Sequence, residues 1–179
     1  MTMMDKVIGA MTPLESDEHR QRARTDARAS AGRGWLALII DHHEQIEQAF
    51  ADVAAARSAT GRRAAQKELG ILLTGHSNAE ESVIYPALAK IGDRSASQEA
   101  FKEQSEAKTE MAMLEDLEPM SEAYLAKLEE IRTAVQHHVF EEESTWFPQL
   151  RREADTAQQA RLTRRYKEEF ERYAATDLG

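Results

Sequence analysis

The stretch 138–148, HVFEEESTWFP, places a histidine, three successive glutamates and an aromatic-proline pair within eleven residues. The stretch 76–86, HSNAEESVIYP, has the same skeleton: a histidine, glutamates four and five positions later, and an aromatic-proline pair at the ninth and tenth positions. One such match would carry little weight, but two matches with the same spacing indicate an internal repeat. Both stretches end long helical patterns, so the repeat predicts two helices that present the same chemical groups.

Apolar residues recur at steps of three and four over four segments of the chain, as on one face of an α-helix. These segments cover about residues 35–57, 62–90, 97–117 and 121–148. Ser121 is a suitable N-cap for the last helix. The connections are short, which makes consecutive helices antiparallel. The sequence therefore predicts an all-α fold, an up-down-up-down four-helix bundle over residues 35–150.

The two ends of the chain differ from this central part. Residues 1–34 mix charges, Ser and Gly without sustained periodicity and end in AGRG, so we expect a mobile N-terminal tail with room for one short helix. Residues 151–179 are charged helix formers, and we expect an additional C-terminal helix on the surface. A chain of 179 residues with 41% hydrophobic content fits one domain with tails.

The composition excludes several classes of function. The formal net charge is -9 and basic residues form no stripe, so nucleic acid is not an expected partner. The longest apolar run, WLALII at 35–40, is far shorter than the roughly 20 residues that span a bilayer. The first 34 residues lack the pattern of a signal peptide, so we expect a cytoplasmic protein without a membrane partner. The chain has no cysteine, so a metal site must use His, Asp and Glu.

Five polar residues interrupt the inward apolar faces of the predicted helices. An ionised carboxylate buried in such a core costs several kcal/mol unless it is paired or coordinated, and these faces carry no Lys or Arg. Residues four apart lie one above the other on a helix, so a histidine and a glutamate at this spacing can bind one metal cluster together. The candidate metal ligands are His43, His76, Glu80, His138 and Glu142.

Other residues near these positions have simpler interpretations. A lone histidine on an apolar face is usually a hydrogen-bonded core residue, but five in-phase polar residues at repeated spacing favour a metal site. The neighbours one step off the faces are expected to face solvent or to support the ligands. For the aromatic-proline pairs a structural role is sufficient, with proline ending or kinking the helix. The off-face neighbours are His42, Glu81, His137, Glu141 and Glu143.

The paired motifs, together with DHHEQIEQAF at 41–50, resemble the hemerythrin-like family, also called the HHE cation-binding domain. The resemblance covers about residues 35–150 and implies a four-helix bundle that holds a non-haem di-iron centre. It implies that the five candidate ligands above bind the two ions. The family expects a further histidine on the third helix, where this chain has Gln104, with Glu103 beside it. Either the Glu103 carboxylate substitutes through a small helix rotation, or one metal position stays open for water or a small molecule.

The resemblance implies two iron ions per chain, although imidazole with carboxylate also suits manganese or zinc. The leading hypothesis is a protein that binds or senses dioxygen, nitric oxide or peroxide, in stress response or iron handling. One alternative is a di-iron enzyme with peroxidase, catalase-like, nitric oxide reducing or iron-sulfur cluster repair activity. Another is a partner-binding bundle with a vestigial metal site. The sequence leaves the oligomeric state open.

Overall fold

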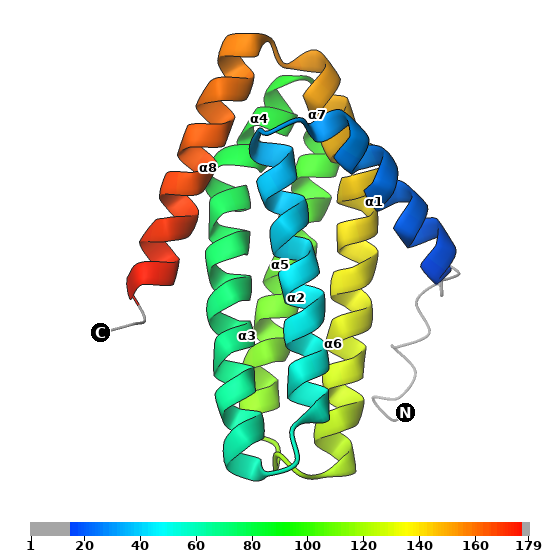
Figure 1. Ribbon diagram of the computed structural model, residues 1–179, viewed down its shortest axis with the longest axis vertical. Helices are drawn as coiled ribbons and strands as arrows, with labels where there is room; N and C mark the ends of the chain where they lie inside the picture. Colours follow the sequence, from blue (N-terminus) through cyan, green and yellow to red (C-terminus); the bar gives the residue numbers. More distant parts are fainter. Residues whose placement is uncertain (1–14, 177–179) are drawn as a thin grey trace, which may run out of the picture.

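The computed structural model describes residues 15–176, and this part of the chain is entirely helical. Four long helices lie side by side and alternate in direction along the chain (Figure 1). They are α2 (Trp35–Ala55), α3 (Ala59–Ala79), α5 (Arg94–Glu115) and α6 (Glu122–Glu141). The predicted all-α bundle is confirmed, with helix boundaries within a few residues of those expected.

Polar caps start three of these helices. The Ser58 hydroxyl accepts from the Gly61 N–H at 3.1 Å at the start of α3. Asp93 caps α5 in the same way, and Ser121, the predicted cap of the last bundle helix, accepts from the Tyr124 N–H at 3.1 Å. Each cap satisfies a backbone donor that has no partner within its helix, which fixes where the helix begins.

The core is divided into two apolar clusters along the bundle axis. One cluster surrounds Phe50, Leu69 and Tyr124 at the end where α2 meets α3, and the other surrounds Trp35 and Tyr85 at the opposite end. Three helices carry the candidate ligands. Along each of them, the ligands lie between a residue of one cluster and a residue of the other. The fold therefore places the polar residues in a layer between two apolar layers.

Each repeated motif ends in a π turn. The first, η2 (Glu80–Ile84), leads into α4 (Tyr85–Lys90), and the Tyr85 N–H donates to the Glu80 carbonyl. The second, η3 (Glu142–Trp146), leads into α7 (Phe147–Glu153) with the equivalent bond. Proline two positions into the following helix lacks an N–H and would clash with the carbonyl four residues earlier, which a wide turn relieves. The helix thus continues past each proline and does not end there.

The N-terminal segment is not simply a mobile tail. Residues Asp17–Ala31 form helix α1, which Ser16 caps through a bond from the His19 N–H at 3.3 Å. Arg24, Ala27 and Ala31 are buried. The helix that we allowed for in this segment is present, but its packing on the bundle was not predicted, because the buried face of α1 consists of alanines and one arginine, which give no apolar periodicity. Residues 1–14 lie outside the described part of the chain.

The C-terminal helix α8 (Thr156–Thr176) begins later than residue 151, because α7 extends to Glu153. In Figure 1, α8 descends beside α3. It is more than a surface addition, since Tyr166 is fully buried. A Cβ atom on Gly75 would stand 3.3 Å from the Phe170 ring, so the missing side chain allows this close approach. The expected helix is confirmed for residues 156–176, and residues 177–179 lie outside the described range.

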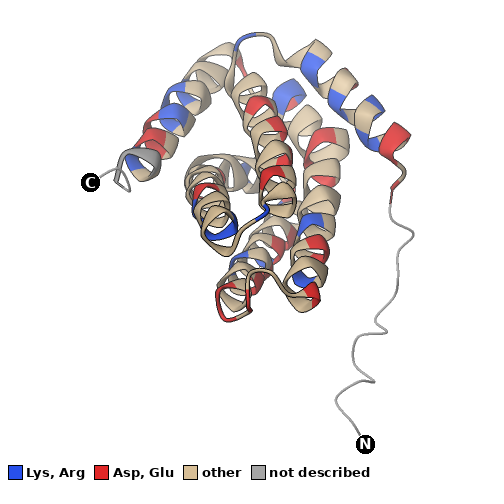
Figure 2. Cartoon of the chain, turned by 60° about the horizontal axis from the view of Figure 1, so that its bottom comes forward, with Lys and Arg blue, Asp and Glu red and all other residues tan. Residues whose placement is uncertain are grey.

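Charged residues of both signs share the outer surface. Figure 2 shows Lys and Arg on α1 and α8 together with Asp and Glu on the same helices. Many of them form ion pairs within one helix, such as Arg22 with Glu18 at 3.0 Å. Among the described helices, none is long and apolar enough to cross a membrane.

Candidate metal centre

Four buried side chains from three parts of the bundle meet in the polar layer. His43 comes from α2, His76 from α3, and Glu80 and Glu142 are the first residues of the two π turns. Each offers one ligand atom, and these atoms all lie within 4.8 Å of one another. Both glutamates are fully buried. Ligands bound to one ion at about 2.0–2.2 Å stand at most about 4.4 Å apart, and the 3.2 Å between His43 Nε2 and Glu142 Oε2 lies within that limit.

The two repeated motifs contribute equivalent pairs to the centre. His76 Nε2 lies 3.2 Å from Glu80 Oε2, and His138 Nε2 lies 3.2 Å from Glu142 Oε1. His43 Nε2 lies between the two carboxylates, 3.2 Å from Glu142 Oε2 and 3.9 Å from Glu80 Oε1. The structure therefore brings together all five residues that the sequence analysis selected on the inward faces.

Four buried polar atoms at this centre have no hydrogen-bond partner: His43 Nε2, Glu80 Oε1, Glu142 Oε2 and Gln104 Oε1. A buried polar group without a partner costs about 1–3 kcal/mol, and more when it is charged. The nitrogen and the two carboxylate oxygens are ligand types that iron, manganese and zinc accept. The donor set thus fits a divalent cation, which would satisfy atoms that the protein itself leaves unpaired.

The protonation of the centre reflects its burial and its paired carboxylates. Burial raises the pKa of Glu80 well above its usual value, and the charge of Glu142 adds to the rise. For Glu142, the opposite effect of His138 and His43 outweighs burial and lowers the pKa. Burial also opposes charge on His43, but Glu142 and Glu143 outweigh it and raise its pKa to about 9. Without a metal, protons therefore supply the positive charge that the carboxylates need.

His43 is held from behind by a chain of charged groups. Its Nδ1 lies 2.8 Å from Glu143 Oε1, and Glu143 is itself buried. Arg24 from α1 donates to Glu143 at 3.0 Å and to Glu47 at 2.9 Å. We expected Glu143 to face solvent or to support the ligands, and the structure gives it the supporting position. Arg24 was not predicted, because no pattern in residues 17–31 indicates that α1 packs on the bundle.

The other two histidines are held in the same way. The Tyr166 hydroxyl from α8 lies 3.1 Å from His76 Nδ1 and 2.8 Å from His42 Nδ1. His138 Nδ1 lies 2.7 Å from Glu103 Oε2. Because an outer partner occupies each Nδ1, all three inward histidines present Nε2 to the centre, an arrangement common around metal-binding histidines.

The third bundle helix places its two candidate residues differently relative to the centre. Gln104 is buried and its side-chain NH2 donates to Glu80 Oε2 and to the Tyr85 hydroxyl, both at 2.5 Å. Glu103 does not enter the centre, because its carboxylate binds His138 on the side of the ring away from Glu142. The structure therefore makes Glu103 a support for His138 and leaves Gln104 at the position where a histidine is missing.

Tyr85 belongs to the centre, although the sequence analysis gave it only a packing role. Its hydroxyl donates to Glu142 Oε1 at 2.8 Å and lies 3.1 Å from Glu80 Oε2 and from His138 Nε2. In an uninterrupted α-helix, nine residues at about 100° each would put Tyr85 on the face opposite His76. The π turn adds a residue to the intervening turn and rotates Tyr85 inward. The equivalent aromatic in the other repeat, Phe147, has no hydroxyl.

The remaining off-face residues form a half-buried group beside the centre. Glu103, His137 and Glu141 lie close enough to share an ion. His137 Nδ1 lies 2.7 Å from Glu15 Oε1 and Glu103 binds His138, whereas the buried Glu141 Oε2 has no hydrogen-bond partner. Glu81 forms an ion pair with Lys108 at 2.6 Å. Glu81 thus pairs with a lysine, whereas Glu143, the equivalent residue of the other motif, holds His43.

Comparison with known proteins defines the class to which this fold and centre belong. The model of the hemerythrin HHE cation binding domain matches residues 36–150, so the chain belongs to that family. A crystal structure from Mycobacterium kansasii, of an HHE cation binding domain-containing protein that is a Rv2633c homolog, has a TM-score of 0.71. It shares 22% sequence identity over 81% of this chain and 90% of that chain, which shows a common fold.

A curated protein from Nostoc sp., named DNA nickase, is also similar to this chain. The two are 30% identical over 95 residues, which amount to 53% of this chain. The match covers 27% of the Nostoc protein, so this chain resembles about a quarter of that relative's length.

Proposed function

We propose that this protein is a non-haem di-iron protein whose centre binds or senses dioxygen, nitric oxide or peroxide, in stress response or iron handling. The observation that carries the proposal is the set of buried, mutually facing His and Glu atoms without hydrogen-bond partners. Membership of a cation-binding family supports it. The proposed ligands are His43, His76, Glu80, His138 and Glu142, with manganese or zinc as possible replacements for iron.

Iron bound here would supply redox chemistry and an open coordination position for a small molecule. The protein keeps both carboxylates and all three histidines largely away from bulk solvent. Burial, with the nearby carboxylates, raises the pKa of Tyr85 well above its usual value, so the hydroxyl stays protonated. It can therefore donate a hydrogen bond to an anionic group at the centre. Gln104, with a free carbonyl oxygen, leaves room where a third-helix histidine would otherwise bind.

The proposal is tested by loading the protein with ferrous iron without oxygen and then adding dioxygen, nitric oxide or hydrogen peroxide. We expect a change in visible absorption with at least one of these molecules. His138→Ala should abolish it, whereas the matched variant His137→Ala, whose histidine points to Glu15, should keep it. A fully iron-loaded protein whose spectrum stays constant with all three molecules would overturn the proposed function.

A di-iron enzyme is the second candidate, and the Tyr85 hydroxyl favours it because a protonated group contacts both carboxylates. Such a group could deliver a proton to a bound peroxide. Peroxide consumption that persists through repurification and disappears in Glu80→Ala would favour turnover over sensing. Less than one metal per chain would instead favour a vestigial site.

We further propose that DNA is not a partner of this chain. The activity named for the Nostoc relative belongs to a protein of which the matched part is 27%. The present chain has a formal net charge of -9, and its basic residues lie among acidic ones (Figure 2). A phosphate backbone needs a concentration of positive charge, so a duplex-binding assay at low salt should show no binding.

A further inference from the structure

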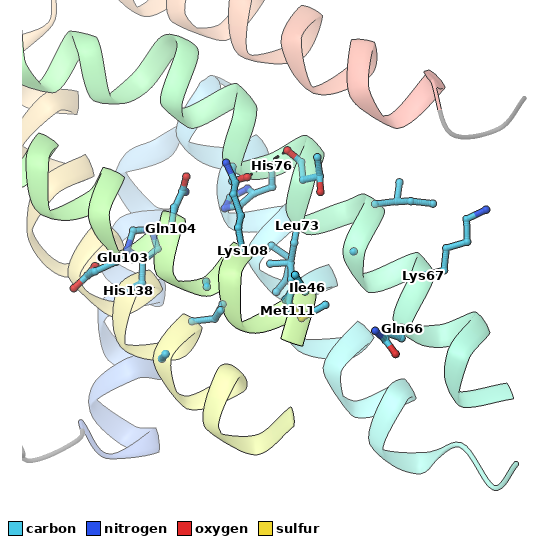
Figure 3. Close-up of a pocket in the computed structure, with 18 of the residues that line it drawn as sticks. Ile46, Gln66, Lys67, Leu73, His76, Glu103, Gln104, Lys108, Met111 and His138 are labelled. Atoms are coloured by element: carbon cyan, nitrogen blue, oxygen red, sulfur yellow. Dashed lines mark hydrogen bonds and ion pairs between the residues drawn. The ribbon is translucent and has the colours of Figure 1, made fainter. Parts of the chain in front are cut away.

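A cavity of about 660 Å³ lies between α3, α5 and α6 and reaches the metal centre. Figure 3 shows its lining, with His76, Gln104 and His138 at one end and Gln66 and Lys67 at the other. A small diatomic molecule needs roughly the 30 Å³ of a water molecule. Pockets of 300–1,000 Å³ typically hold organic ligands, so the cavity is far larger than the proposed small ligands require.

The middle of the cavity is apolar. Ile46, Leu73 and Met111 lie between the two ends in Figure 3, from α2, α3 and α5. Gly70 also lines the cavity, and no atom lies within 4 Å of the place where its Cβ would stand. A hydrocarbon chain in this space would bury apolar surface on both partners, which is favourable by about 25 cal/mol per Å².

The end remote from the metal centre carries positive charge. The Arg63 guanidinium donates to Gln66 Oε1 and to the carbonyls of Leu114 and Leu117, all of them uncharged. Among the described side chains, neither Arg63 nor Lys67 forms an ion pair with a carboxylate, whereas Lys108 is paired with Glu81. The exposed Glu115 also lines the cavity, so two cations and one carboxylate give this end a net charge of +1. Within an acidic chain, this end attracts an anion.

The length of the cavity limits the ligand. Lys67 and His76 are nine residues apart on α3, and nine residues at 1.5 Å each span about 13 Å. An extended medium-chain acid is of this length. A longer chain would protrude into solvent, and a shorter one would not reach from the cationic end to the centre.

We propose that this cavity binds a medium-chain monocarboxylic acid. Its carboxylate lies at Arg63 and Lys67, its hydrocarbon chain lies along Leu73 and Met111, and its last carbons point to the His/Glu centre. The carboxylate and most of the chain contact no proposed metal ligand, so binding does not require a bound metal and goes beyond the proposed function.

The direct test is calorimetric titration of the protein with decanoate, in metal-free and iron-loaded forms. We expect saturable binding of one decanoate per chain in both forms. Decylamine has the same chain with the opposite charge and should bind at least tenfold more weakly. Equal binding of decylamine, or no saturable binding of decanoate, would overturn the proposal. A failure of the iron-loaded protein to respond to oxygen would leave the metal-free result intact, so the two proposals fail separately.

Two variants place the ligand in the cavity. Gly70→Leu adds a side chain to the cavity lining at a position where a Cβ meets no atom within 4 Å, and it favours the helix, so the fold should persist. It should weaken decanoate binding at least tenfold, while the matched control Ala64→Leu, at an exposed position on α3 away from the cavity, should not. Decanoate binding to Gly70→Leu with unchanged affinity would show that the ligand lies elsewhere.

The charge of the cationic end is tested separately. Lys67→Glu reverses an exposed charge and should weaken decanoate binding by about threefold to tenfold, as expected for an exposed ion pair and its reversal. Lys90→Glu makes the same change at an exposed position outside the cavity and should leave the affinity unchanged. Equal effects of the two variants would contradict the proposed orientation, because they would report only the net charge of the protein.

Discussion

Among single residues, Gln104 determines what the third bundle helix offers to the centre. Gln104 fills the position of a histidine with an amide that donates to Glu80 and Tyr85 and leaves its carbonyl oxygen without a partner. An amide is a weaker ligand for iron than imidazole. The two ions of the proposed centre should therefore be held with unequal affinity.

The first prediction follows from this asymmetry. Gln104→His should supply the missing imidazole, so the protein should retain more iron during dialysis against a chelator. Ser105→His adds a histidine at an exposed neighbouring position and serves as the control. Iron retained per chain, measured by elemental analysis, should rise in the first variant alone. No gain for Gln104→His over the parent would mean that the third helix does not border a metal position.

At the scale of helices, the two flanking elements complete the centre. Helix α1 brings Arg24 to Glu143, which holds His43, and helix α8 brings Tyr166 to His76. Neither helix provides a proposed ligand. Both fix the orientation of an imidazole, and outer partners of this kind commonly change metal affinity by 10–100-fold.

The Arg24 contact predicts a difference in stability. The side chains of Arg24 and Glu143 are 10% and 2% exposed, and removing one partner of such a pair typically costs about 3–5 kcal/mol. Arg24→Leu should lower the free energy of unfolding of the metal-free protein by about 3 kcal/mol in urea denaturation. Arg28, also on α1, forms exposed ion pairs with Asp41 and Glu44 of α2. Arg28→Leu breaks these pairs and should lower the free energy of unfolding by at most about 1 kcal/mol. If both variants lose at most about 1 kcal/mol of unfolding free energy, α1 contributes little to the stability of the fold.

The Tyr166 contact predicts a difference in metal binding. Tyr166→Phe keeps the buried ring and removes the hydroxyl that contacts His76 Nδ1. The iron affinity, measured by competition with a chelator, should fall by about 10–100-fold. Tyr173→Phe removes a hydroxyl from a partly exposed position of the same helix and should leave the affinity as it is. If both variants bind iron like the parent, α8 covers the centre without tuning it.

The two π turns are features of the helices that the periodicity of the sequence does not reveal. The sequence predicts helices through both motifs, because their apolar residues and ligands recur at helical steps. It does not show that each helix widens by one residue at its glutamate, and this widening carries Tyr85 to the centre. A phase calculation on an ideal α-helix therefore misplaces Tyr85.

Across the whole molecule, the features that could be predicted from the sequence are those whose pattern lies within one helix. The bundle and the five inward residues follow from periodicity and from the repeated motif, which act within one helix. Arg24 and Tyr166 reach partners 119 and 90 residues away, and no pattern within α1 or α8 announces those contacts. The role of Glu103 could not be predicted either, because it depends on the rotation of α5 against the His138 ring.

The charge state of the whole centre predicts a pH dependence. The pKa of His43 is raised to about 9, above its ordinary 6.5, so in the metal-free protein it stabilises the fold below about pH 6.5 and loses this contribution as the pH rises through 9. A metal needs the neutral ring, so binding at pH 7 must release this proton and weaken as the pH falls. Calorimetry in buffers of different ionisation enthalpy should show at least one proton released per chain. Identical heats in all buffers would contradict this.

The central claim is that the buried His and Glu residues form a metal centre. The most direct test is elemental analysis of the protein purified from iron-rich culture, beside Glu80→Gln and Glu142→Gln, which keep the shape of the side chains and remove their charge. We expect about two iron ions per chain in the parent protein and a clear loss in both variants. Well under one metal ion per chain in the parent, or an unchanged content in the variants, would contradict it.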